Sequence, residues 1–111
     1  MAAVANLRID QGASFSSDVT VTNSDGDAVN LSGYTTEARL AKSYGASSNV
    51  SFTTSIADDT TTGVITLSLT DSQTGALDAP ARYVYDVYIT QTSSSTVTRV
   101  IEGVITVNPK V

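Results

Sequence analysis

The stretch Arg82–Thr90, RYVYDVYIT, decides the fold because its apolar side chains recur at every second residue. Tyr83, Tyr85, Val87 and Ile89 would fall on one face of an extended chain, and the residues between them on the other. Such alternation predicts a β-strand with one buried face. The tyrosines and β-branched residues in this stretch also pack well on a pleated surface, which favours the same structure.

The same alternation recurs along the rest of the chain. The 34–44 segment also contains helix-forming residues, but strict alternation after Tyr34-Thr35-Thr36 favours a strand. The last segment is apolar on both faces at Val100-Ile101 and Val104-Ile105, which predicts either a bulge near Gly103 or a strand covered on both sides. Including 82–90, the predicted strands cover 7–9, 15–22, 29–31, 34–44, 50–54, 64–69 and 97–107.

One short helical turn interrupts this series. Thr70-Asp71-Ser72-Gln73 matches a capping box, and Gly75 and Pro80 limit the helix to a turn or two. Segments 45–49 and 57–63 are loops by composition. Seven or eight short strands with one helical turn predict a single all-β domain over residues 1–111, an antiparallel immunoglobulin-like β-sandwich. In such a fold the hydroxyl of Tyr83 would pin the corner before its strand.

The acidic stretch Asn23-Ser24-Asp25-Gly26-Asp27 raises the question of a calcium loop. With Gly26 at the sixth position of such a loop, the first position is Val21, which has no side-chain oxygen. The twelfth position is Ser32, where a calcium loop requires a bidentate Glu. A hairpin turn with Gly26 in the left-handed conformation fits the sequence better, with a weak surface cation site as the alternative.

Composition excludes several classes of function. The chain has no Cys and no His, which removes disulfides, thiolate nucleophiles, imidazole bases and the usual zinc, copper and haem ligands. The net charge is −5, and the six basic residues are scattered, so we expect binding neither to nucleic acid nor to an anionic membrane. No signal peptide or apolar span is visible, which predicts synthesis and assembly in a cytoplasm.

The remaining catalytic option is a pair of carboxylates. Asp25/Asp27 and Asp58-Asp59 are the close acidic pairs, and both fall in predicted loops rich in turn-forming residues. A chain of 111 residues offers little material for the cleft that a glycosidase pair requires. We therefore predict no catalytic, cofactor-binding or metal-binding residues.

Sugar binding is the alternative that the aromatic residues leave open. Tyr83 and Tyr85 lie on the predicted core face, so Tyr34, Tyr44 and Tyr88 remain for the surface of an adhesion or carbohydrate-binding module. A further polar pair, Arg99 and Glu102, lies on opposite faces of a regular strand unless the bulge intervenes, and is interpreted as solvated or as cross-strand partners of Asp86 and Arg82.

Five segments of the chain occur in a recognisable order. They are IDQGASFSSDVTV (9–21), DGDAVNLSGYTTEARLAKSYG (25–45), ITLSLT (65–70), ARYVYDVYI (81–89) and TRVIEGVITVNPKV (98–111). Together they resemble small virion proteins of tailed bacteriophages, especially cyanobacterial and other marine phages, and more distantly the amino-terminal immunoglobulin-like domain of phage upper baseplate proteins.

The resemblance spans nearly the whole chain and implies a non-enzymatic structural protein of the virion, assembled in the host cytoplasm. It implies many copies, or a homo-oligomer, on the capsid as decoration or in the tail or baseplate, with other virion proteins as partners. The final strand is where we expect contacts first.

Overall fold

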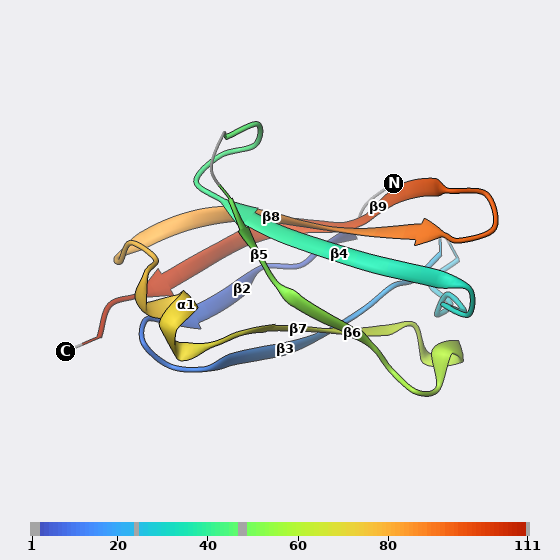
Figure 1. Ribbon diagram of the computed structural model, residues 1–111, viewed down its shortest axis with the longest axis horizontal. Coiled ribbons are helices and arrows are strands. Elements are labelled where there is room, and N and C mark those ends of the chain that lie inside the picture. The colour runs from blue at the N-terminus through green and yellow to red at the C-terminus, as the bar shows by residue number, and fades with distance from the viewer. Residues whose placement is uncertain (1–2, 24, 47–48, 111) are drawn as a thin grey trace.

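Two β-sheets pack face to face in the computed structural model, which describes residues 3–23, 25–46 and 49–110 (Figure 1). In the larger sheet the order is β1-β9-β8-β4-β5, with β2 also paired to β9, and in the smaller sheet it is β3-β7-β6. The larger sheet contains β1 (Ala3–Val4), β2 (Leu7–Asp10), β4 (Tyr34–Ala41), β5 (Val50–Ser51), β8 (Ala81–Gln91) and β9 (Thr96–Asn108). The smaller sheet contains β3 (Phe15–Thr20), β6 (Thr53–Ile56) and β7 (Val64–Leu69).

The predicted all-β sandwich is confirmed, and alternation builds its core. Tyr83, Tyr85, Val87 and Ile89 of β8 are at most 7% exposed, as the opening stretch predicts. Inward side chains of both sheets join them in one hydrophobic cluster. The 34–44 segment forms a strand through Ala41, not a helix. Period-two burial therefore holds the two sheets together.

The corner before β8 and the helical turn also confirm predictions. The amide of Asp78 donates to the Tyr83 hydroxyl at 2.9 Å, as expected of a tyrosine corner. Helix α1 (Asp71–Gly75) begins with the predicted capping box. The Gln73 amide donates to Thr70 Oγ1 at 3.2 Å, and the Gln73 side chain accepts from the Thr70 amide at 2.9 Å.

The loops contain one predicted turn and one short helix that was not predicted. Gly26 donates to the Asn23 carbonyl at 3.0 Å and has a φ of +87°, which confirms a tight turn there; Ser24 lies outside the described residues. Helix η1 (Thr60–Thr62) occupies the predicted 57–63 loop. Of the predicted 45–49 loop, Ser47 and Ser48 lie outside the described residues. No helix in the described part of the chain is long and apolar enough to span a membrane.

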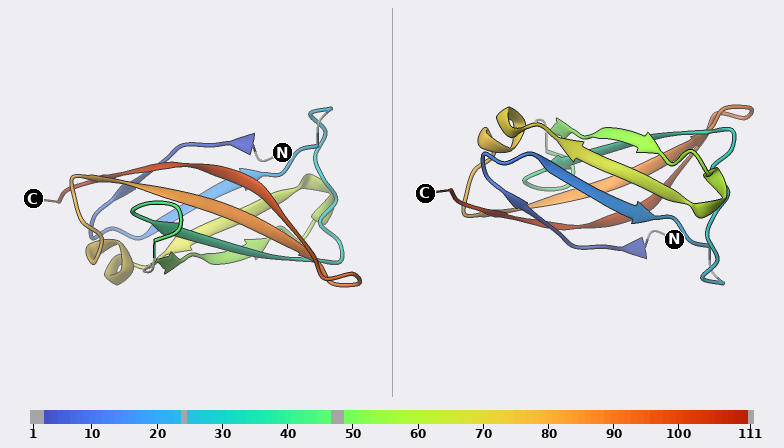
Figure 2. Two further views of the ribbon diagram at one scale, coloured as in Figure 1. Left: turned by 90° about the horizontal axis from the view of Figure 1, so that it is seen from above. Right: turned by 90° about the horizontal axis from the view of Figure 1, so that it is seen from below.

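The first strands depart from the expected antiparallel pairing. Both β1 and β2 run parallel to β9, along the same edge, so the two ends of the chain lie in neighbouring strands (Figure 2). Sequence alternation predicted only the second of them, because β1 has two residues and a strand that short carries no period.

The chain bends between β1 and β2 at the point where it passes Gly103. The Ala5 amide donates to the Glu102 carbonyl at 2.9 Å, and the Ala5 carbonyl accepts from the buried Tyr85 hydroxyl. A Cβ atom at residue 103 would lie 2.1 Å from the Ala5 carbonyl oxygen, so only glycine leaves room for it. Gly103 itself therefore permits a close backbone approach, and the bulge predicted near it lies three residues earlier, at Val100.

The predicted strand at 29–31 is wrong. This segment crosses from β3 in one sheet to β4 in the other, and therefore joins no ladder. The Leu31 amide donates to the Thr60 carbonyl at 3.0 Å, and the Leu31 side chain is 1% exposed. Its apolar alternation reflects residues that close the end of the sandwich.

The predicted strand at 50–54 is divided between the sheets. β5 pairs with β4, whereas β6 pairs with β7, and the change occurs at Phe52. The Phe52 amide donates to the Ala38 carbonyl at 2.9 Å. Its ring lies 6.1 Å from that of Phe15 and 6.2 Å from that of Tyr85, measured between centroids. One buried aromatic residue thus connects both layers.

Candidate binding groove on the outer sheet face

A bulge in β9 brings together side chains that a regular strand would separate. Val87 pairs with Ile101 but Tyr88 pairs with Arg99, so Val100 is the extra residue. Because of this shift Arg99 and Glu102 reach the same, outward face of the larger sheet, and their charged atoms lie 3.3 Å apart. The prediction of a bulge near Gly103 is confirmed, with the extra residue three positions before that glycine.

Arg99 is the centre of a polar cluster on this face. Its guanidinium lies 3.6 Å from the Asp86 carboxylate and donates to the Tyr88 hydroxyl at 3.2 Å. The hydrogen bond to Tyr88 raises the pKa of Arg99, and the carboxylates of Asp86 and Glu102 add to the effect. Asp86 and Glu102 stand directly opposite each other on β8 and β9, so the guanidinium compensates a like-charge pair.

The loop between β4 and β5 stands above the outer face and carries a second tyrosine to Arg99 (Figure 2). The guanidinium carbon lies 5.7 Å from the ring centroid of Tyr44 and 5.7 Å from that of Tyr88. Tyr44 is 53% exposed, yet partial burial, followed by the charge of Glu102, raises its pKa. Its hydroxyl is therefore protonated at neutral pH and able to donate.

The start of this loop is anchored to the corner before β8 through Lys42. Lys42 Nζ lies 2.7 Å from Asp78 Oδ2, and 5.3 Å from the ring centroid of Tyr83. The hydrogen bond to Asp78 raises the pKa of Lys42. Further on, the Ala46 amide donates to the Ser43 carbonyl at 3.2 Å, with Gly45 at a φ of +78°. These contacts fix the two sides of the loop around Tyr44, whose ring lies against Arg99 of the sheet.

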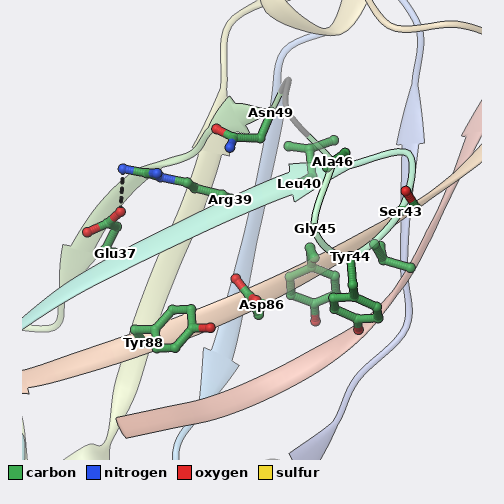
Figure 3. A pocket seen from close by; sticks show the side chains of 13 residues that line it. Glu37, Arg39, Leu40, Ser43, Tyr44, Gly45, Ala46, Asn49, Asp86 and Tyr88 are labelled. Carbon is green, nitrogen blue, oxygen red and sulfur yellow. Dashed lines mark ion pairs between the residues drawn. The ribbon is translucent and has the colours of Figure 1, made fainter. Parts of the chain in front are cut away.

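A groove of about 290 Å³ lies beneath the loop, between β4 and β8 (Figure 3). One side carries the ion pair of Arg39 with Glu37, and the other carries Tyr88, Asp86 and Tyr44. Asn49 borders the groove from the end of the loop, and Val84 forms part of its apolar lining. Exposed fractions of the Arg39 and Glu37 side chains are 51% and 60%. Aromatic rings, carboxylates, a guanidinium and an amide thus face one open space.

Two of the three predicted surface tyrosines meet at this groove. Tyr44 and Tyr88 line it, whereas Tyr34 packs against the hydrophobic core and borders a separate hollow of about 610 Å³ at the end of the sandwich. Tyr34 is half-buried, as Tyr88 is, but it lies apart from the other two tyrosines. The expected cross-strand ion pair of Arg99 with Asp86 is confirmed. The expected pairing of Glu102 with Arg82 is wrong, because Glu102 lies opposite Asp86 and Arg82 lies opposite Thr106.

Local hydrogen bonds fix the backbone of both loops that carry the acidic pairs. Asp59 caps η1 by accepting from the Thr61 amide at 3.2 Å. Asn23 Oδ1 accepts from the amides of Asp25 and Asp27 at 2.9 and 3.1 Å. Within residues 3–23, 25–46 and 49–110, no group of three or more acidic side chains is placed to hold a metal ion.

The final strand is less accessible than expected. β9 lies inside the larger sheet, with β1 and β2 along one edge and β8 along the other. From Ile101 onward its inward side chains are buried, whereas residues 96–99 at its start are all exposed. Among its outward side chains, Val97 is 59% exposed and Val104 is 36% exposed. Apolar residues on both faces of β9 reflect the bulge at Val100 together with these exposed valines.

The arrangement is suited to binding a polar surface or ligand, because aromatic rings and paired charges converge on one face. No protein-family model matches this chain, and a search of curated proteins finds no significant relative.

Proposed function

We propose that this protein is a non-enzymatic structural subunit of a tailed-phage virion, present in many copies and joined to capsid, tail or baseplate proteins through protein–protein contacts. The observation that carries the proposal is the outer face of the larger sheet. Val4 is 70% exposed beside Glu102, and Val104 is exposed opposite Val84. Exposed valines beside Tyr88 and Arg99 give this face the aromatic, Arg-containing composition of protein interfaces.

The resemblance to small virion proteins supports the same function. Its segments include the strands that build both sheets, and the protein is acidic, rich in Ser and Thr, and without Cys or His. Such a chain is suited to contacts between folded surfaces. A particle built by symmetry would repeat one contact face in every copy.

The test is mass spectrometry of purified tailed-phage particles from the virus that encodes the chain. We expect its peptides at a copy number that matches a symmetric part of the capsid, tail or baseplate. Purified wild-type particles that contain none of its peptides would contradict the proposal. Copy number would also separate a capsid decoration from a baseplate part.

A pair of variants tests which face makes the contact. Val104→Glu places a charge among the exposed valines of the larger sheet and is expected to lower incorporation into particles at least about tenfold, because it buries an unpaired charge in the interface. Ser16→Glu adds the same charge to β3, where residue 16 is exposed on the smaller sheet, and is the matched control. Equal incorporation of both variants would place the contact elsewhere.

A further inference from the structure

We propose that the groove between Tyr44 and Tyr88 binds an uncharged saccharide. The groove shares Tyr88 with the outer face described above, but its other lining residues lie on β4, on β8 and in the loop above them, so saccharide binding can be measured on the isolated protein without virion assembly. The exposed valines Val4 and Val104 lie on the β9 side.

The charged side chains that line the groove are partnered by other side chains of the protein, which favours an uncharged ligand. Glu37 and Arg39 form one ion pair in the lining, and Asp86 is paired with Arg99, which lies beside the groove. Arg99 also contacts Glu102, so this second cluster keeps one net negative charge, which disfavours an anionic ligand. Each pair offers acceptors beside donors, the pattern that neighbouring hydroxyl groups of a sugar satisfy through hydrogen bonds. Charge-assisted hydrogen bonds would be formed without bringing a new charge out of water.

A cationic ligand fits this site less well. Arg99 already occupies the position between the two carboxylates, within 5.7 Å of both tyrosine rings. An incoming lysine or arginine side chain would meet that guanidinium at the point where attraction should be greatest. A free anion would meet the carboxylates of Glu37 and Asp86 instead.

The two tyrosines supply the apolar contact that sugar rings require. Tyr88 is held by its hydrogen bond from Arg99, and Tyr44 lies against the same guanidinium from the loop. Rings fixed before binding lose little conformational entropy when a ligand arrives. The volume of about 290 Å³ is near the lower end for small-molecule sites, which fits one or two sugar residues.

The experiment begins with a glycan array that holds neutral hexose and N-acetylhexosamine oligosaccharides beside sialylated and sulfated ones. We expect binding to neutral members only. Titration calorimetry with the best neutral oligosaccharide then gives the dissociation constant. We expect a weak, millimolar to micromolar constant, which corresponds to a binding free energy of about −4 to −8 kcal/mol.

Three variants locate the site. Tyr88→Ala removes a ring, Tyr44→Ala removes the ring on the loop, and Asp86→Asn keeps the shape of the side chain but changes one acceptor into a donor. Each is expected to weaken binding at least about tenfold. Tyr34→Phe, whose ring lies outside the groove, is the matched control and should bind as the unmodified protein does.

The outcomes are distinct from those of the virion experiment. No saccharide binding on the array, binding of charged glycans only, or equal affinity of all variants would overturn the inference. Tyr44→Ala keeps the test valid if Tyr88→Ala unfolds, because residue 44 lies in an exposed loop. If the protein is found in particles but binds no glycan on the array, the assembly proposal stands and the saccharide proposal is wrong.

Discussion

Tyr85 and Tyr88 belong to the same strand, but they face opposite sides of the larger sheet. Tyr85 is 1% exposed, and its hydroxyl donates to a backbone carbonyl, that of Ala5. Tyr88 is half-buried on the outer face, and its hydroxyl accepts from the side chain of Arg99. The inner tyrosine fixes the backbone at Ala5, whereas the outer one orients the guanidinium of Arg99. Changes on the inner face should therefore cost stability, and changes on the outer face should cost binding.

The largest effect is expected from Gly103→Ala. Its Cβ would lie 2.1 Å from the carbonyl oxygen of Ala5 and 3.0 Å from the Tyr85 ring, so β1 and the bend after it must move. We expect a loss of about 3 kcal/mol in the free energy of unfolding, measured by urea denaturation. Gly75→Ala is the control, since its nearest new contact would be 3.9 Å away. Equal midpoints for the two variants would show that the backbone approach at Gly103 is dispensable.

The second effect is alkaline destabilisation through Tyr85. Burial, followed by the nearby Tyr44, raises the pKa of Tyr85 to about 12. The unfolded chain keeps an ordinary value of about 10, so the protonated phenol favours the folded state. This stabilisation is fully present below about pH 10 and is lost as pH rises through 12, with about 2 kcal/mol lost by pH 12.

Urea midpoints at several pH values between neutral and about 11.5 would measure this loss. Tyr85→Phe should be less stable at neutral pH, because the Ala5 carbonyl loses its donor, but its stability should fall less over the alkaline window. If both proteins lost the same free energy between pH 10 and 12, titration of the inner tyrosine would not be the cause.

The third effect concerns the corner before β8. Tyr83→Phe removes the acceptor for the Asp78 amide, and we expect a loss of about 1 kcal/mol, read from the denaturation midpoint. The outer-face counterpart is Tyr88→Phe, which removes one hydroxyl from an exposed cluster and should change stability by less than about 0.5 kcal/mol. A larger loss at Tyr88 than at Tyr83 would reverse the division between the faces.

A small effect on stability is also expected from Arg99→Ala. Although this side chain contacts Asp86, Glu102 and Tyr88, it is 40% exposed, and exposed ion pairs contribute about 0–1 kcal/mol. Differential scanning calorimetry at low and high salt should show a small difference that shrinks with salt. A cooperative loss of the whole fold would mean that the cluster belongs to the folded core.

Local patterns allowed much of the fold to be predicted from the sequence. Alternation located the central strands, the capping box located α1, and the tyrosine corner followed from the position of Tyr83. Each of these depends on residues close together in the chain. Leu31 shows the limit, because an apolar residue that closes the end of a sandwich has the same spacing as one in a strand.

The groove depends on longer-range geometry. Tyr44 and Tyr88 were recognised as surface aromatics, but their meeting required the loop to fold back over β8 and Val100 to form the bulge. Apolar residues on both faces of the last strand did indicate a bulge, yet its position depends on the register with β8. The divided strand at Phe52 likewise results from competition between two sheets, which neighbouring residues do not reveal.

The parallel pairing of the first strands with β9 determines how strongly the domain resists unfolding under tension. Tension applied to the two chain ends would pull β2 and β9 along their shared axis in opposite directions. The ladder from Leu7–Ile105 to Asp10–Asn108 would then be sheared as a unit, whereas a hairpin pulled from its open end unzips bond by bond. Single-molecule pulling from the ends should thus require more force than pulling across β8 and β9, which makes the domain a tether that resists stretching along the direction of its chain.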